Sequence, residues 1–153
     1  MSEKEYIRRK IAKEVMRKAW FTFKNCMLSW RTCLIIRWRT VRFLTPIRHT
    51  KIRGTTFNNR QEILRRLSQY PVRDIRLSFL REPDNAHDTN AIVVMATVRN
   101  KGSAGVGYLS REISSWLAPI IDSGGEIVVM LSDITGVNRE GSFLGMNLEY
   151  IML

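Results

Sequence analysis

The spacing of apolar residues changes near Pro46. Between residues 5 and 24, and again between 27 and 41, apolar residues recur every three or four positions, which is the period of one face of an α-helix. Beyond this proline, apolar and polar residues alternate from Ile75 to Phe79 and from Met146 to Met152, which is the period of a half-buried strand. The sequence therefore predicts an α+β protein with a helical N-terminal part and a mainly β C-terminal part.

Residues 1–45 are predicted to form a helical hairpin. Its first helix runs from Glu5 to Lys24, and its second carries Met27, Trp30, Leu34, Trp38 and Val41 at helical spacing. Because aromatic stripes at this spacing usually belong to a core, we expect the tryptophans to be buried between the two arms. Thr45-Pro46 ends the second helix, since proline lacks an N–H and disfavours a helical conformation in the residue before it. Residues 46–50 are the predicted linker.

Residues 51–153 are predicted to form a single barrel domain. Strand patterns lie at 51–57, 75–79, 91–98, 106–109, 126–131 and 146–152. Two short helices interrupt them, one at 60–67 and one that begins after Ser110 as its N-cap and ends at the turn 122–125. Five or six short strands with two helices in about 100 residues favour a small, partly open, OB-like β-barrel.

Positive charge is concentrated in the predicted hairpin. The whole chain has a formal charge of +11, but residues 1–50 hold 13 basic and 3 acidic side chains, against 12 and 11 in residues 51–153. This excess favours nucleic acid or an anionic membrane surface as a partner. Three interpretations of the hairpin stay open: a packing element with exposed arginines, a membrane-surface helix, or a phosphate-binding element. The arginines that would contact phosphates are Arg31, Arg37, Arg39 and Arg42.

Several classes of protein are not expected. The N-terminus has no apolar signal segment, and arginines interrupt the stretch from Cys26 to Leu44, so we expect a cytoplasmic protein without stable membrane insertion. The two cysteines suggest neither a disulfide framework nor a metal site. His87 and Asp88 are adjacent, and neighbouring side chains do not orient each other as a catalytic triad does. We therefore expect no enzyme activity, no cofactor and no metal.

A polar run from Arg81 to Ile92, REPDNAHDTNAI, separates two predicted strands. By itself such a run is typical of a turn whose side chains cap their own backbone. Together with IRGTTFNNR at 52–60, VGYLSRE at 106–112 and LAP at 117–119, however, it resembles the HIRAN domain. The resemblance covers about residues 51–153. HIRAN domains occur alone in bacteria and phages, and at the N-terminus of helicase-like chromatin and fork-remodelling proteins of eukaryotes.

The resemblance implies an OB-like barrel that binds single-stranded DNA and, in the best-understood eukaryotic members, captures the free 3′-hydroxyl end. Phe57 and Phe143 match positions where aromatic rings stack on bases. Asp88 matches the acid that accepts a hydrogen bond from the 3′-hydroxyl, and Asn85 and His87 match its polar and aromatic neighbours. The alternatives are core packing for the two phenylalanines and loop capping for Asp88 and Asn85.

This sequence departs from the end-binding members of the family at two positions. Thr56 stands where those members have an arginine before the stacking aromatic residue, and Ala86 stands where they have a proline. The basic residues that could replace the missing arginine are Lys51, Arg53, Arg60, Arg81 and Arg111. Among them, Arg53, Arg60 and Arg111 are those that we expect to contact phosphates.

We therefore expect a DNA-binding protein. Its barrel would bind single-stranded or frayed DNA, at free 3′ ends, and the basic hairpin would add phosphate contacts. The alternative belongs to another class: an interaction or inhibitory protein of a phage or mobile element, which docks on a partner protein through residues 1–45 and uses the barrel as a scaffold.

Overall fold

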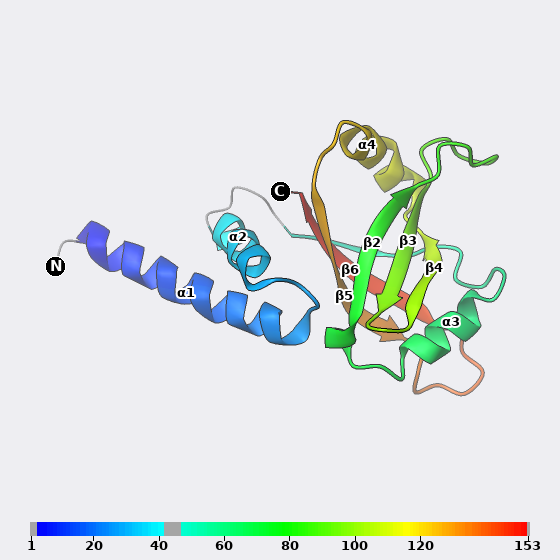
Figure 1. Cartoon of the computed structure of the whole chain (residues 1–153), viewed down its shortest axis with the longest axis horizontal. Coiled ribbons are helices and arrows are strands. Elements are labelled where there is room, and N and C mark those ends of the chain that lie inside the picture. Colours follow the sequence, from blue (N-terminus) through cyan, green and yellow to red (C-terminus); the bar gives the residue numbers. More distant parts are fainter. Residues whose placement is uncertain (1–2, 42–46, 153) are drawn as a thin grey trace.

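The computed structural model describes residues 3–41 and 47–152, which form a helical hairpin beside a β-barrel (Figure 1). The hairpin consists of α1 (Glu3–Asn25) and α2 (Trp30–Val41). The second helix begins after Ser29, whose Oγ accepts the N–H of Thr32 at 3.1 Å, as an N-cap does. The two predicted helices are present, while their predicted end at Thr45-Pro46 lies outside the described residues.

The prediction that the tryptophans fill the space between the arms is wrong. Trp20 and Trp38 are 51% and 42% exposed, and Trp30 is half-buried. The buried residues of the two helices are Val15, Ala19, Thr22, Cys33 and Ile36. Trp30 of α2 still meets Trp20 and Phe23 of α1 edge-on, with ring centres 5.8 and 5.7 Å apart. The aromatic rings therefore contact each other across the two helices at the surface of the hairpin, while smaller side chains are buried.

One antiparallel sheet of six strands forms the C-terminal part. The strands are β1 (Arg48–Lys51), β2 (Ile75–Arg81), β3 (Ile92–Val98), β4 (Gly102–Tyr108), β5 (Ile127–Thr135) and β6 (Gly145–Met152). Their order across the sheet is β1-β6-β5-β2-β3-β4. The first and last strands of this order are therefore β1 and β4.

The chain immediately after β1 closes the sheet into a barrel. Arg53 N donates to Tyr108 O at 2.7 Å, and Tyr108 N donates to Arg53 O at 2.9 Å, so the two edges of the sheet pair at this point. The backbones meet closely, because a Cβ added at Gly107 would lie 2.6 Å from the carbonyl oxygen of Arg53. The expected OB-like barrel is thus present, and its closure depends on a glycine beside Tyr108.

The first strand differs from the prediction. It runs from Arg48 to Lys51, and the extended chain that was predicted to reach Phe57 is replaced by tight turns. Gly54 and Asn58 have φ values of +70° and +55°, a left-handed conformation that strands do not use. The strand also begins inside the segment predicted as a linker, and the division of the chain at residues 45 and 50 stays a prediction.

Two further helices lie where the sequence predicts them. The first, α3 (Arg60–Leu67), follows the turns after β1. The second, α4 (Arg111–Asp122), begins after Ser110, whose Oγ accepts the N–H of Ile113 at 3.4 Å. A short 3-10 helix, η1 (Val72–Asp74), precedes β2 and was not predicted.

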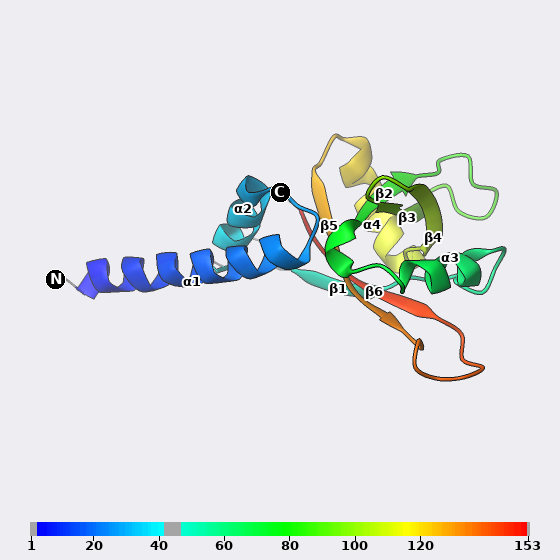
Figure 2. The same cartoon turned by 60° about the horizontal axis from the view of Figure 1, so that its bottom comes forward.

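The hydrophobic core lies inside the barrel. Alternate residues of the strands point inward and meet the apolar sides of α3 and α4; fully buried examples are Leu64, Ile92, Val106, Leu117 and Leu148. The outer face of β5 and β6 also carries buried apolar residues, because Ile36 of α2 packs there on Val128 and Ile151. The hairpin is therefore attached to the outside of the barrel (Figures 1 and 2).

Within residues 3–41 and 47–152, no helix combines the length and the apolar character needed to cross a membrane.

Candidate nucleic-acid interface

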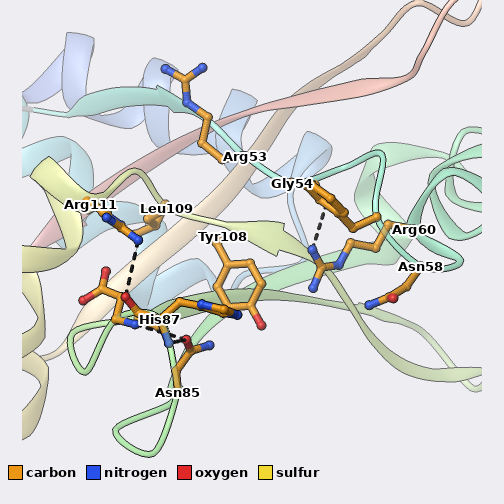
Figure 3. A pocket seen from close by; sticks show the side chains of 12 residues that line it. Arg53, Gly54, Asn58, Arg60, Asn85, His87, Tyr108, Leu109 and Arg111 are labelled. Atoms are coloured by element: carbon orange, nitrogen blue, oxygen red, sulfur yellow. Dashed lines mark hydrogen bonds between the residues drawn. The ribbon is translucent and has the colours of Figure 1, made fainter.

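Three segments that are distant in the sequence meet around one pocket of about 640 Å³. They are the turns after β1, the loop between β2 and β3, and the chain that follows β4. Figure 3 shows their side chains from close by. The residues that line the pocket are Arg53, Gly54, Phe57, Asn58, Arg60, Asn85, His87, Asp88, Ala91, Tyr108, Leu109 and Arg111. This volume lies in the range of pockets that take small ligands.

The turns after β1 present an aromatic ring next to an oriented guanidinium group. Phe57 is 67% exposed, so its ring is not part of the core and one face is open to a ligand. Arg60 Nη1 donates to Gly54 O at 2.8 Å, and its guanidinium carbon lies 4.8 Å from the ring centre of Tyr108. The carbonyl and the aromatic ring fix the direction of Arg60, while further N–H groups of the same guanidinium remain for a phosphate.

The loop between β2 and β3 is held by its own polar side chains. Asn85 Oδ1 accepts the backbone N–H groups of His87 and Asp88 at 3.0 and 3.2 Å. Asp88 Oδ1 accepts the N–H of Asn90 at 2.9 Å. Loop capping, the alternative stated for these two residues, is therefore real. It uses one carboxylate oxygen of Asp88, and Oδ2 has no protein hydrogen-bond partner within the part of the chain that the structure describes.

Glu82 ties this loop to β4. Its Oε2 accepts hydrogen bonds from Asn85 Nδ2 at 3.0 Å and from the hydroxyl of Tyr108 at 2.9 Å. Burial, followed by the bond to this carboxylate, raises the pKa of Tyr108, so the phenol stays protonated and keeps donating. Arg81 fixes the other end of the loop, since it donates to Ala91 O at 2.8 Å and pairs with Asp122 at 2.9 Å. The loop is thus preorganised rather than free to adapt.

Two further arginines and a histidine of the pocket are accessible to solvent. Arg53, His87 and Arg111 are exposed, and Arg111 Nη2 donates to the carbonyl of His87 at 3.3 Å. In Figure 3 the guanidinium of Arg53 extends away from Tyr108 and Arg60, whereas Arg111 reaches toward the loop of His87. With Asp88 as the one acid among the lining residues, the rim of the pocket is positively charged, which favours a phosphate-bearing ligand.

Two of the predicted residues lie outside this pocket. Thr56 is exposed on the turn but does not line it. Phe143, 73% exposed, lines a neighbouring recess of about 450 Å³ in the loop between β5 and β6. Gln61 joins the two places: its Nε2 donates to Thr55 O and Leu144 O, both at 2.9 Å, and its Oε1 accepts Leu144 N at 2.8 Å.

The arginines of the hairpin lie in different environments. Arg31 is exposed and Arg39 is half-buried. Arg37 donates to Thr22 Oγ1 from Nε at 2.8 Å and from Nη2 at 2.6 Å, so it links the two helices. Arg42 lies outside the described residues. The proposed phosphate contacts of these side chains stay predictions.

Sequence reasoning missed three residues of the site. Tyr108 lies inside a segment that supported the resemblance, yet the sequence analysis assigned it no role. Glu82 and Asn58 were also missed. The left-handed conformation of Asn58 has a signal in the sequence, since Asn-Asn pairs are frequent in turns, whereas nothing in the sequence joins Glu82 to Tyr108.

The sequence model of the HIRAN domain matches residues 50–140. Among solved structures, the chain is similar to a protein from Lactobacillus plantarum, with 19% identity and a TM-score of 0.50 over 68% of this chain and 89% of that chain. It is also similar to the HIRAN domain of human HLTF, with 24% identity and a TM-score of 0.46 over 69% of this chain and 74% of that chain. The first likeness supports the fold alone. No curated protein matches the chain.

Proposed function

The chain belongs to the HIRAN domain family, and on this premise we propose that its barrel binds single-stranded or frayed DNA, with a free 3′ end in the pocket between the turns after β1 and the β2–β3 loop. Family membership suggests DNA binding. One observation carries the finer proposal: seven residues selected from the sequence line the same pocket. They are Arg53, Phe57, Arg60, Asn85, His87, Asp88 and Arg111.

Each group has a task in this proposal. The exposed ring of Phe57 stacks on a base, a contact worth about 1–3 kcal/mol. Arg60 and Arg111 donate to the last phosphates. Asp88 accepts the 3′-hydroxyl through Oδ2, the carboxylate oxygen that the loop does not use. We propose binding and no catalytic step.

Residues outside the pocket are proposed to contact further nucleotides of the bound DNA strand. Phe143 offers a second stacking surface in the recess that Gln61 connects to the turn at Thr55. Thr56 provides a neutral hydroxyl where end-binding members of the family have an arginine, so it donates to a phosphate without adding charge. Asn85 and His87 complete the wall of the pocket.

The decisive experiment compares oligonucleotides that end in a 3′-hydroxyl with identical ones that end in a 3′-phosphate. Wild type should prefer the hydroxyl, because a terminal phosphate meets the carboxylate of Asp88. Phe57→Ala should weaken binding of both forms about 5- to 150-fold. Val72→Ala, which removes an exposed apolar side chain from η1, is the matched control and should bind as wild type does.

Asp88→Asn separates end recognition from loop structure. Asparagine also forms the turn that Asp88 makes with Asn90, so the loop should be retained while the charge is lost. We expect this variant to bind the two ends almost equally, through loss of the 3′-hydroxyl preference. Equal affinities already in wild type would refute end recognition, and absence of binding to any strand at low salt would refute the function itself.

The hairpin arginines should contribute through charge. If Arg31 and Arg39 contact phosphates, replacing both with glutamine should lower the slope of log affinity against log salt by about 2, since each phosphate contact contributes about 1. Binding of wild type should fall steeply between about 50 and 200 mM salt. An unchanged slope in the double variant would place the phosphate contacts elsewhere.

A further inference from the structure

Three aromatic side chains, two from α1 and one from α2, gather at the surface of the hairpin. Trp20, Phe23 and Trp30 form this aromatic cluster. The rings of Trp20 and Phe23 are stacked at 29° with centres 6.0 Å apart, and Trp30 meets both edge-on at 5.8 and 5.7 Å. Trp20 and Phe23 are both exposed. A large apolar surface that stays open to water on a small protein indicates a binding site.

Lysines surround this cluster. The ammonium group of Lys24 lies 5.1 Å from the centre of the Trp20 ring. Because an α-helix turns by 100° per residue, Lys13 and Lys24 lie within about 40° of Trp20 around the axis of α1, and both are exposed. The one acid described with its side chain on α1, Glu14, is already paired with Arg17 and Lys18 at 2.8 and 3.2 Å. The exposed apolar residues of this face, Met16, Trp20 and Phe23, thus lie between Lys13 and Lys24 along α1.

This face is separate from the pocket of the barrel. The hairpin attaches through Ile36 to the outer surface of β5 and β6, while the pocket lies at the turns after β1 and the β2–β3 loop. In both views of the whole chain, α1 points away from the barrel on one side and these loops lie on the other side (Figures 1 and 2). A ligand at the cluster therefore does not share the groups of the pocket.

The positive charge and the aromatic residues of this face indicate which class of ligand it binds. A second copy of this chain would bring two strongly basic hairpins together, which like charges oppose. A membrane-surface helix separates a polar face from a broad apolar face, whereas here the exposed Lys13 and Lys24 lie on the same face as the rings. Single-stranded nucleic acid matches both features, since its phosphates pair with cations and its bases stack on aromatic rings.

We propose that the aromatic cluster and the lysines beside it form a second binding site for single-stranded nucleic acid, independent of the pocket in the barrel. Lys13 and Lys24 are 11 residues apart on α1, about 16 Å at 1.5 Å per residue. At about 3.4 Å per stacked nucleotide, this site covers roughly five nucleotides. The chain then holds two strands, or two parts of one strand, on opposite sides of the barrel.

The test is to count the hexathymidylate oligonucleotides that one full-length chain binds at low salt, by calorimetry. Wild type should bind two. The variant Trp20→Ala with Lys24→Gln should lose the hairpin site, with affinity there reduced about 5- to 150-fold, and bind one. The matched control is Phe21→Ala with Lys10→Gln, which removes an exposed ring and an exposed lysine from another side of α1 and should bind two.

A second variant guards against a folding defect. Lys13→Gln with Lys24→Gln changes exposed charges alone, and should lower the salt slope at the hairpin site by about 2. Far-UV circular dichroism should be the same for all variants. Retention of both binding events by both cluster variants would overturn the proposal. So would binding of phosphatidylserine vesicles that requires Trp20 while oligonucleotide binding does not.

The test distinguishes an error in the function proposed for the pocket from an error in the proposed hairpin site. Phe57→Ala should abolish binding of the oligonucleotide at the barrel and leave binding at the hairpin. If Phe57→Ala changes nothing while the cluster variant abolishes all binding, the function proposed for the pocket is wrong and the hairpin site is supported. The opposite pattern refutes the hairpin site alone.

Discussion

The barrel and the hairpin show opposite relations between hydrophobic pattern and burial. In β6, Met146, Leu148 and Tyr150 alternate in the sequence and are all buried, because a closed sheet has only one interior. In the hairpin, Trp20 and Trp38 lie at helical spacing and are exposed. A helix that contacts one neighbouring helix and one sheet buries a narrow stripe, and spacing alone does not say which stripe. The spacing of apolar residues therefore predicts burial reliably where an element is packed within the barrel, and less reliably where it contacts only one or two neighbours.

Charge divides the molecule in the same way. The barrel has nearly balanced charge, and its arginines make directed contacts: Arg60 with Gly54 and Tyr108, and Arg81 with the β2–β3 loop and Asp122. In the hairpin the excess of basic residues is mostly displayed to solvent. The binding that we propose for the barrel therefore depends on positioned groups, and the binding that we propose for the hairpin depends on positive potential and aromatic surface.

The largest expected effect comes from one substitution made in both regions. Ile92 in β3 and Ile36 in α2 are both fully buried, but Ile92 belongs to the barrel core and Ile36 to the small cluster with Val128 and Ile151. Replacing Ile92 with alanine should cost about 4 kcal/mol of unfolding free energy, and replacing Ile36 about 2, because the smaller cluster collapses more easily around the cavity. Urea titration followed by circular dichroism measures both, and equal losses would contradict the comparison.

The next effect concerns the closure of the barrel. A methyl group at position 107 would meet Arg53 O at 2.6 Å, so Gly107→Ala should separate the two edges of the sheet and cost about 1–3 kcal/mol. It should also weaken DNA binding, since Tyr108 and Arg53 both line the pocket. Gly124→Ala tests glycine replacement where no atom lies within 4 Å of the added methyl group. DNA binding by that variant should be unchanged.

A smaller effect is expected inside the hairpin. Thr22→Val removes the oxygen that accepts both hydrogen bonds from Arg37 while it keeps the shape of the side chain. The cost should be about 1–2 kcal/mol, because the half-buried guanidinium group regains only part of its hydration. Thermal unfolding monitored by tryptophan fluorescence would measure it. An unfolding temperature equal to that of wild type would contradict this contribution of the contact between Thr22 and Arg37.

The smallest effect appears at high pH. Burial, together with the nearby Cys26 thiol, raises the pKa of Cys33 from 9.0 to about 11. The folded state therefore keeps a proton that the unfolded state loses, so stability is complete below pH 9 and falls as the pH rises from 9 to 11. At pH 10 the loss should be about 1 kcal/mol, and Cys33→Ala should remove this dependence. A thiol reagent that modified Cys33 readily at pH 7 would contradict its burial.

The segments and the site could be predicted to different degrees. Helices α3 and α4, the Ser110 cap and most strands follow from local patterns, because each depends on neighbours within a few residues. The turns after β1 were predicted as a strand, since Thr55, Thr56 and Phe57 favour extended chain while Gly54 and Asn58 impose left-handed turns. Tyr108 and Glu82 escaped prediction, because the bond that joins them links positions 26 apart.

The sequence by itself determined the α+β class and the division of charge between the N-terminal segment and the rest, because these follow from local spacing and composition. It also supplied, through the resemblance, the residue types of the proposed DNA site. Only the tertiary structure decided that Phe57, Asp88 and Arg111 line one pocket, that Phe143 lies in the next recess, and that Trp20 and Trp38 of the hairpin are exposed. The physical reason is that burial and proximity depend on which surfaces meet, and the surfaces meet where the barrel closes at Arg53 and Tyr108 and where Ile36 packs on β5 and β6.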